Sequence, residues 1–269
     1  MSARARTGAI VAVVAHPDDE ALIAGGTLAL AVDAGLATGV VARTRGELGP
    51  ISDPLLADEG TLGAVREREL RASAASLGVD WTSCLRHPDG MLEWVDAEVV
   101  AVELAALLRA RRPAVLLTFG EDGIYGHADH VATRAIAVRA AELLGPDGPL
   151  VYEAVWAPSL AGELVAAARS RGLPHSLWGL EPEAFGSPPC DARSASKLTR
   201  LDVRAVVDRK LEALRAHRTQ LDDDHLLTEL PIDLAARHLG EEVWRQADAQ
   251  ACDVLGELLG AHLTAAAHG

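Results

Sequence analysis

Short apolar segments alternate with amphipathic ones along roughly the first 156 residues of the chain. The apolar segments have the length and the Val and Leu content of strands buried on both faces of a sheet. They lie at 9–15, 38–43, 79–85, 114–118 and 150–156. The segments between them carry apolar residues at helical spacing and predict helices at 21–34, 61–77, 96–111 and 128–143. Strands that alternate with helices predict an α/β fold with a mostly parallel sheet and right-handed crossovers.

The second half of the chain loses this alternation after Pro158. Several prolines punctuate residues 158–197, which predicts an irregular excursion over the mouth of the sheet, and long loops of this kind often cover sites. A strand near 198–204, a helix at 206–217 and a helical tail at 248–266 complete the predicted elements. Because no linker composition or internal repeat divides the chain, we expect one Rossmann-like domain over residues 1–269, with the excursion forming part of a pocket.

The composition narrows the range of partners. The chain carries 25 Lys and Arg against 39 Asp and Glu, a net charge of −14, which argues against nucleic acid and against an anionic membrane surface. No segment approaches the roughly 18 apolar residues of a membrane span. The apolar run at 9–15 follows two arginines but reads as a buried strand rather than as the core of a signal peptide. Cys84, Cys190 and Cys252 are too widely spaced for a disulfide framework or a metal motif, so we expect a cytoplasmic protein.

An imidazole and three carboxylates follow the first predicted strand, in Ala15-His-Pro-Asp-Asp-Glu20. Open α/β sheets bind their ligands at the carboxyl ends of parallel strands. A solvated turn with an acid capping the next helix would explain one or two of these acids, but it does not explain His16. His16 and Asp19, separated by a turn that proline makes rigid, can instead chelate one metal ion and leave Asp18 on a different side of the loop.

A second cluster, Tyr125-Gly-His-Ala-Asp-His130, lies where the fourth predicted strand gives way to its helix. His127 and His130 project to one side of the first helical turn, and Asp129 between them can support one of them. A single histidine at a helix start is usually a cap or a surface residue, but two such clusters in one sheet point to a shared site. We expect two metal ligands from the first cluster and one from the second, with positions left for water and substrate. Mixed nitrogen and oxygen ligands suit Zn²⁺, with Fe²⁺ as the alternative.

These two motifs, in this order and each after a strand, resemble those of the PIG-L, or LmbE-like, zinc-dependent de-N-acetylases. That family hydrolyses N-acyl groups of glucosamine-containing molecules. Weaker similarities lie at Thr44-Arg-Gly-Glu-Leu-Gly49, at Arg66-Glu-Arg-Glu-Leu70 and at Lys210 with His217-Arg-Thr-Gln220. Together they span about residues 9–220. Residues 158–197 match nothing assignable, and in this family that region helps to shape the substrate pocket.

The resemblance implies how the metal and the attacking water are handled. His16, Asp19 and His130 would hold the metal, and Asp18 would act as general base towards the water. The chemistry of the loop agrees, because a carboxylate beside a dication stays ionised and can accept a proton.

The resemblance also implies how the tetrahedral oxyanion is stabilised. The metal, His127 as an imidazolium and the Tyr125 hydroxyl would share this role, and one oxyanion donor is typically worth about 3–4 kcal/mol. Asp129 would favour the charged form of His127 and fix the orientation of its ring.

Three residues outside the two motifs are expected to bind the substrate. Arg66 matches an arginine that hydrogen-bonds sugar hydroxyls in the family, although its spacing from neighbouring arginines also fits a solvated helix face. Glu47 reaches the site, supports a ligand or is a plain loop acid. Asp89, in a second His-Pro-Asp segment that reads as a turn, is a candidate polar contact.

Four further residues have two readings each. Lys210 and His217 lie seven residues apart on a predicted helix and either face the pocket or are structural. Trp156 and Trp178 border the excursion, where packing is the ordinary role and stacking on a sugar the more specific one.

Other functions share parts of this pattern. A metallo-β-lactamase-type hydrolase would share Gly126-His-Ala-Asp-His130, but Tyr125 stands where that motif has its first histidine, and an αββα sandwich does not alternate strands with helices. A non-catalytic metal-binding protein is disfavoured because neither motif is degenerate. Within the family, the net charge and the lack of an anchor favour a soluble amino-sugar substrate over a lipid, with a mycothiol S-conjugate-type amidase as the alternative. The Ala-rich helices can pack within one subunit or between subunits, which leaves a homo-oligomer open.

Overall fold

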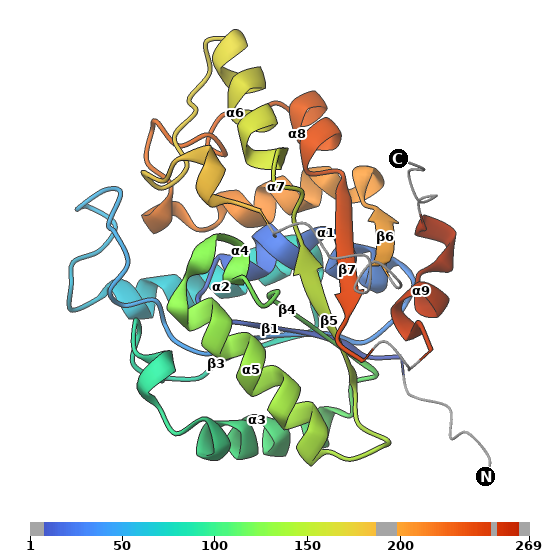
Figure 1. Ribbon diagram of the computed structural model, residues 1–269. Coiled ribbons are helices and arrows are strands. Elements are labelled where there is room, and N and C mark those ends of the chain that lie inside the picture. Colours follow the sequence, from blue (N-terminus) through green and yellow to red (C-terminus); the bar gives the residue numbers. More distant parts are fainter. Residues whose placement is uncertain (1–7, 187–197, 249–251, 264–269) are drawn as a thin grey trace.

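The computed structural model describes residues 8–186, 198–248 and 252–263. One seven-stranded sheet runs through them in the order β3-β2-β1-β4-β5-β7-β6 (Figure 1). Its strands are β1 (Ile10–Val14), β2 (Thr38–Ala42), β3 (Trp81–Cys84), β4 (Val115–Thr118), β5 (Leu150–Val155), β6 (Leu198–Asp202) and β7 (Glu241–Gln246). The first five strands pair in parallel, whereas β7 pairs antiparallel with both β5 and β6. The predicted α/β fold with a mostly parallel sheet is therefore confirmed.

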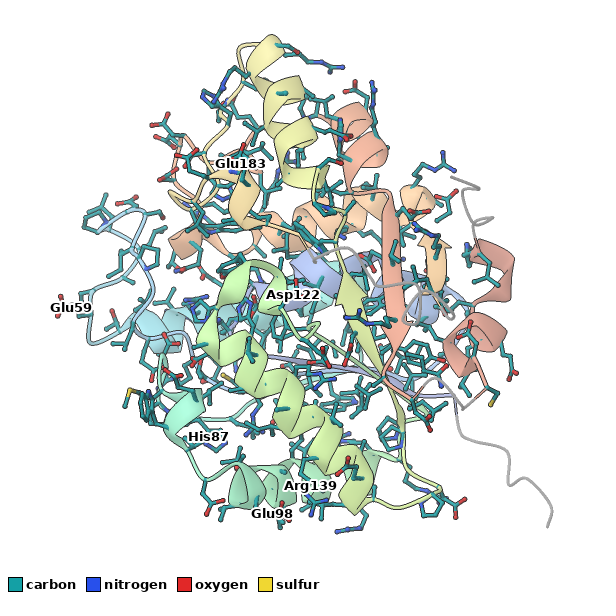
Figure 2. All side chains as sticks on the ribbon, in the orientation of Figure 1. Glu59, His87, Glu98, Asp122, Arg139 and Glu183 are labelled. Carbon is teal, nitrogen blue, oxygen red and sulfur yellow. The ribbon has the colours of Figure 1, made fainter. Side chains whose placement is uncertain are left out.

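Helices cover both faces of the sheet (Figure 1). One face carries α1 (Asp19–Asp33), α2 (Leu62–Leu77) and α7 (Val207–Arg215), and the other carries α3 (Ala97–Arg111) and α5 (Ala128–Leu143). Successive β1 residues such as Ala12 and Val13 belong to the two separate apolar cores, because side chains alternate across a strand. On the second face Arg139 of α5 lies 2.7 Å from Glu98 of α3, an ion pair that links the two helices (Figure 2).

Local capping chemistry sets the ends of the predicted helices. Asp96 accepts hydrogen bonds from the backbone N–H groups of Glu98 and Val99 and so begins α3. Gly78, at a φ of 82°, closes α2 in the left-handed conformation that glycine adopts at little cost. The sequence signals therefore coincide with the actual boundaries.

The C-terminal half is more regular than its sequence pattern suggests. The helix α6 (Leu160–Ser170) fills part of the stretch expected to be irregular, and α8 (Ile232–His238) and β7 have no counterpart in the predicted elements. The expectation was wrong for α6 because Pro158 and Pro174 flank the helix instead of interrupting it. The rest of that stretch, residues 187–197 with Cys190, lies outside the described residues.

The predicted helical tail at 248–266 is not one continuous helix where it is described. It contains the short helix α9 (Val254–Leu258) and one 3-10 turn, and residues 249–251 and 264–269 lie outside the described part. The remaining short elements are α4 (Gly123–Gly126) and the 3-10 turns η1 (Leu92–Trp94), η2 (Pro182–Ala184), η3 (Arg204–Val206), η4 (Arg218–Gln220) and η5 (Gly260–His262). Within the described ranges, no helix combines the length and the apolar character that crossing a membrane requires.

β1 and β4 lie side by side in the middle of the sheet, and the strands that follow them in sequence lie on opposite sides of this pair. β2 extends the sheet on one side of this pair and β5 extends it on the other. The crevice above their carboxyl ends is the topological switch point at which open α/β sheets bind ligands. The loops that carry both sequence motifs meet there.

Candidate active site

Three side chains from the two motifs converge above β1 and β4. Asp19 lies between two imidazoles: its Oδ2 is 3.4 Å from Nδ1 of His16, and its Oδ1 is 3.2 Å from Nε2 of His130. All three residues are buried, and one possible ligand atom from each lies within 4.8 Å of the others. Two nitrogens and a carboxylate therefore surround a single point.

The hydrogen bonds of His130 leave one nitrogen free for a ligand. Its Nδ1 lies 3.0 Å from the carbonyl oxygen of Gly123, so the proton sits there and is donated to that oxygen. Its Nε2 is buried and, among the described residues, has no hydrogen-bond partner. The ring also stacks on Phe119 with 4.0 Å between centroids, which fixes its orientation. An unprotonated, buried imidazole nitrogen beside a carboxylate suits a divalent metal, so these residues fit such an ion.

The opposite nitrogen of His16 faces two carboxylates. Its Nε2 lies 3.0 Å from Oδ1 of Asp89 and 3.3 Å from Oδ2 of Asp129. Asp129 is fixed because it also accepts hydrogen bonds from two backbone N–H groups of the 90–92 turn. Burial would lower the pKa of His16, but hydrogen bonds to Asp129, Asp19 and Asp89 outweigh burial and raise it. A proton held on Nε2 leaves Nδ1 free to act as a ligand beside Asp19.

Asp18 lies next to this point but is held by a different partner. Its backbone has a φ of 125°, which is strained for a residue with a side chain. Its Oδ2 lies 2.8 Å from Nη2 of Arg66. Burial raises the pKa of Asp18 to about 6, although the charge of Arg66 opposes the shift. A carboxylate with a pKa near neutrality is suited to take a proton from water.

Arg66 is a buried support for Asp18. Besides that ion pair, its guanidinium donates to the carbonyl oxygens of Pro17 at 2.6 Å and Gly46 at 2.9 Å. A Cβ at Gly46 or Gly49 would collide with the guanidinium, so glycine at these two positions makes the slot that holds it. Arg66 also lines the cavity above the site, and these contacts use three of its five N–H donors, so the expected sugar contact stays a prediction.

Tyr125 and His127, the residues expected at the oxyanion, line the same cavity. The Nδ1 of His127 accepts a hydrogen bond of 3.2 Å from the backbone N–H of Asp129, so the neutral ring carries its proton on Nε2. Burial and two neighbouring imidazoles lower the pKa of His127, and the imidazolium expected for this residue stays a prediction. The carboxylate of Asp129 bonds to His16 and to the turn beyond it, so Asp129 reaches the His127 ring through its backbone N–H. Burial raises the pKa of Tyr125, so its hydroxyl keeps its proton and can donate it.

The cavity above these groups has a volume of about 460 Å³ and a mixed lining, whose polar and apolar members we call the polar wall and the apolar wall. The polar wall contains the motif residues, Arg66 and Asp89. The apolar wall consists of Leu22, Leu48, Pro50, Trp178 and Leu180. Glu47 does not line the cavity; its Oε1 accepts the backbone N–H of Asp89 at 3.1 Å, so it supports the loop that carries Asp89.

Sequence reasoning missed most of the apolar wall and did not identify Gln220 as a residue of the cavity. Leu22, Leu48 and Leu180 come from three separate segments without a common motif, so no local signal identifies them. Gln220 also lines the cavity and belongs to a stretch singled out only for a weak similarity. Trp178, considered as a sugar platform, is the one wall residue whose type drew notice.

Lys210 and His217 do not line the cavity. Lys210 Nζ lies 2.6 Å from Oε1 of Glu242, and His217 Nε2 lies 2.8 Å from Oε1 of Glu20. All four side chains are almost completely buried. The two residues therefore join α7 and the turn after it to β7 and α1 through internal ion pairs.

Comparison with known proteins places the chain in a family. It matches the PIG-L family, described as GlcNAc-PI de-N-acetylase, over residues 11–141, which contain every residue predicted for the site. A 1D-myo-inositol 2-acetamido-2-deoxy-alpha-D-glucopyranoside deacetylase from Acidothermus cellulolyticus is 32% identical over 257 residues, which cover 87% of this chain and 87% of that protein.

Two solved structures share the fold at low identity. The N,N'-diacetylchitobiose deacetylase from Pyrococcus horikoshii has a TM-score of 0.60 at 20% identity, covering 88% of this chain and 83% of that one. The 4-carboxy-2-hydroxymuconate hydratase from Pseudomonas putida KT2440 has a TM-score of 0.61 at 21% identity, covering 91% of this chain and 98% of that one. The fold thus serves unlike reactions, and the relationship in sequence is the more specific finding. On that relationship, the chain belongs to the PIG-L family of de-N-acetylases.

Proposed function

We propose that this protein is a metal-dependent hydrolase that removes the N-acetyl or another N-acyl group from a small amino-sugar substrate. The observation that supports this most is the convergence of His16, Asp19 and His130 beside Asp18 on the polar wall of the cavity. A relative of 32% identity is named as a deacetylase of an N-acetylglucosaminide of inositol. A cavity with a polar wall and an apolar wall suits a sugar, whose ring has hydroxyl edges and apolar faces.

We propose Zn²⁺ as the resident metal, with Fe²⁺ as the alternative. His16 through Nδ1, Asp19 through a carboxylate oxygen and His130 through Nε2 would hold it, a donor set that suits either ion. Such an ion would polarise the amide carbonyl and make a water molecule more acidic.

The residues of the chain then carry the proton and the developing charge. Asp18 takes the proton of the attacking water and passes it to the nitrogen of the leaving amine, while Arg66 keeps its carboxylate in place. The Tyr125 hydroxyl and the Nε2–H of His127 donate hydrogen bonds to the oxygen of the former carbonyl. Asp129 holds His16 and, through its backbone, His127.

We also propose that the chain works as one domain and in the cytoplasm. β6 and β7 extend the sheet that carries the site, which supports a single unit. The described cysteines, Cys84 and Cys252, are free thiols, which suits a reducing compartment.

The experiment that tests the proposal is amine release from a panel of soluble N-acyl amino sugars, with the purified protein supplied with Zn²⁺ or Fe²⁺. We expect release that a chelator abolishes and that His16→Ala lacks. His175→Ala is the matched control, because His175 is exposed and lies outside the cavity. Cleavage of thiol-conjugate amides without any cleavage of the sugars would favour the amidase reading, and a metal-loaded protein that cleaves no amide would overturn the proposal.

A further inference from the structure

A second pocket, lined only by apolar side chains, adjoins the active-site cavity. Leu22 and Trp178 line both spaces and so form the partition between them. We propose that this pocket receives the carbon chain of the substrate's N-acyl group, and that the protein acts on N-acyl amino sugars whose acyl group is longer than acetyl. The inference rests on the proposed deacylation and specifies the substrate of that reaction.

The residues around the partition connect the apolar pocket with the groups proposed to act on the acyl carbonyl. Leu22 stands one helical turn after Asp19 on α1, so the partition begins beside a proposed metal ligand. Tyr125, the proposed donor to the carbonyl oxygen, packs against Phe185 with 5.2 Å between ring centroids, and Phe185 lines the apolar pocket. An acyl carbon next to Asp19 and Tyr125 therefore has the apolar pocket behind it, while the sugar can use the polar wall.

The turn at the partition has a tryptophan at a position whose positive φ is costly for such a side chain. Leu180 N–H donates to the carbonyl oxygen of Leu177 at 2.8 Å, and Trp178 and Gly179 between them have φ values of 49° and 72°. Two successive positive φ values are the pattern of a type I′ turn, whose first position favours Asn, Asp or Gly. A tryptophan held there, with its ring 4.4 Å from that of His225, indicates that the aromatic surface at the partition has a use.

The size of the pocket sets the expected chain length. Its volume of about 20 Å³ suits one group of the size of a water molecule, such as a single methylene added to the acetyl group. Burying one additional methylene corresponds to about a fourfold gain in binding or in kcat/KM. The propanoyl derivative should therefore be the best substrate, and longer chains should decline because they have to displace Trp178 or Leu164.

The test compares kcat/KM for N-acetyl-, N-propanoyl-, N-butanoyl- and N-pentanoylglucosamine. We expect a maximum at propanoyl, about fourfold above acetyl. Leu164→Ala, which enlarges only the apolar pocket, should move the maximum to a longer chain, and Ala161→Leu, which fills it, should move the maximum back to acetyl. Ala166→Leu, on the exposed side of α6, should leave the order unchanged. The melting temperature of each variant shows whether it is folded. If one of the two pocket variants does not fold, the other still tests the proposal.

Three results would overturn the subsite. The first is a decline from acetyl onward that Leu164→Ala does not change. The second is a dependence on the alkyl group of O-alkyl glycosides, which would make the pocket a site for the aglycone. The third is equal affinity for propanoate and acetate in calorimetry of the zinc-loaded protein, where the subsite predicts tighter binding of propanoate. This measurement tests the subsite even if no sugar is cleaved, a result that would count against the proposed function itself.

Discussion

Replacing Asp89 by asparagine should weaken metal binding, although Asp89 is not a proposed ligand. Its Oδ1 lies 3.0 Å from Nε2 of His16, and its Oδ2 accepts the backbone N–H of Leu48 at 2.8 Å. Asparagine offers one oxygen and one NH₂ group, so it can satisfy only one of these donors and places a second donor against the other. His16 then loses part of what holds its Nδ1 towards Asp19.

Two independent magnitudes agree on the size of this effect. The side chains of His16 and Asp89 are only 10% and 7% exposed, so the charge-assisted hydrogen bond between them is worth about 1.5–3 kcal/mol. Loss of a group that orients a metal-binding histidine costs about 10- to 100-fold in metal affinity, which corresponds to about 1.4–2.8 kcal/mol. Burial would raise the pKa of Asp89, but the hydrogen bond and charge of His16 lower it to about 2, which reflects the same favourable contact.

The assay is a titration of metal-free protein with Zn²⁺ in competition with a chromogenic chelator. We expect the Kd of Asp89→Asn to be about 10- to 100-fold above that of the parent. Asp147→Asn, the same change in an exposed turn after α5, should leave the Kd unchanged. Melting temperatures of the metal-free proteins separate an effect on the metal from an effect on the fold. A Kd for Asp89→Asn that equals the parent value would refute the reasoning.

Three further predictions concern the neighbours of the site. Asp18→Asn should bind Zn²⁺ with the parent affinity but lose about 10²- to 10⁴-fold in kcat, the usual contribution of a general base; matching losses of metal would argue against this role. Gly49→Ala should reduce kcat about tenfold or more, because its Cβ displaces Arg66 from Asp18 and weakens a charge-assisted bond; an unchanged kcat would show that Arg66 is not needed there. Burial would lower the pKa of His217, but Glu20 raises it, so the ion pair stabilises the fold below about pH 6.5 and loses that contribution as the pH rises through the folded pKa. In urea unfolding, the difference in free energy between the parent and His217→Gln should therefore shrink between about pH 6 and pH 9, and a constant difference would contradict the assignment.

The N-terminal half of the fold could be predicted because its units are local. Each strand, loop and helix there carries its own signals, such as Asp96 at the start of α3 and Gly78 at the end of α2. β7 lacks such signals because its burial depends on distant residues. Its Glu242 reads as a surface acid, yet it is buried against Lys210 and the backbone N–H groups of Gly26 and Thr27. A pattern within β7 cannot contain those partners.

The candidate site likewise has a part that local motifs predict and a part that depends on segments far apart in the sequence. The residues that converge on one point come from two compact motifs, whose spacing predicted one shared site, while the choice of His130 as the third ligand came from the family resemblance. The direction of Asp129 and Asp89 was not readable, because it depends on the 90–92 turn folding over His16. The apolar wall around Trp178 likewise comes from segments that meet only in the folded chain.

Titrating metal-free protein with Zn²⁺ while following amine release from an N-acyl amino sugar tests the central claim most directly. We predict that activity rises in proportion to the zinc bound and saturates at about one equivalent, since His16, Asp19 and His130 form one set of ligands. Asp19→Ala should show no rise over the same range. Full activity in the metal-free protein, or an Asp19→Ala variant that loads zinc and works like the parent, would contradict the claim.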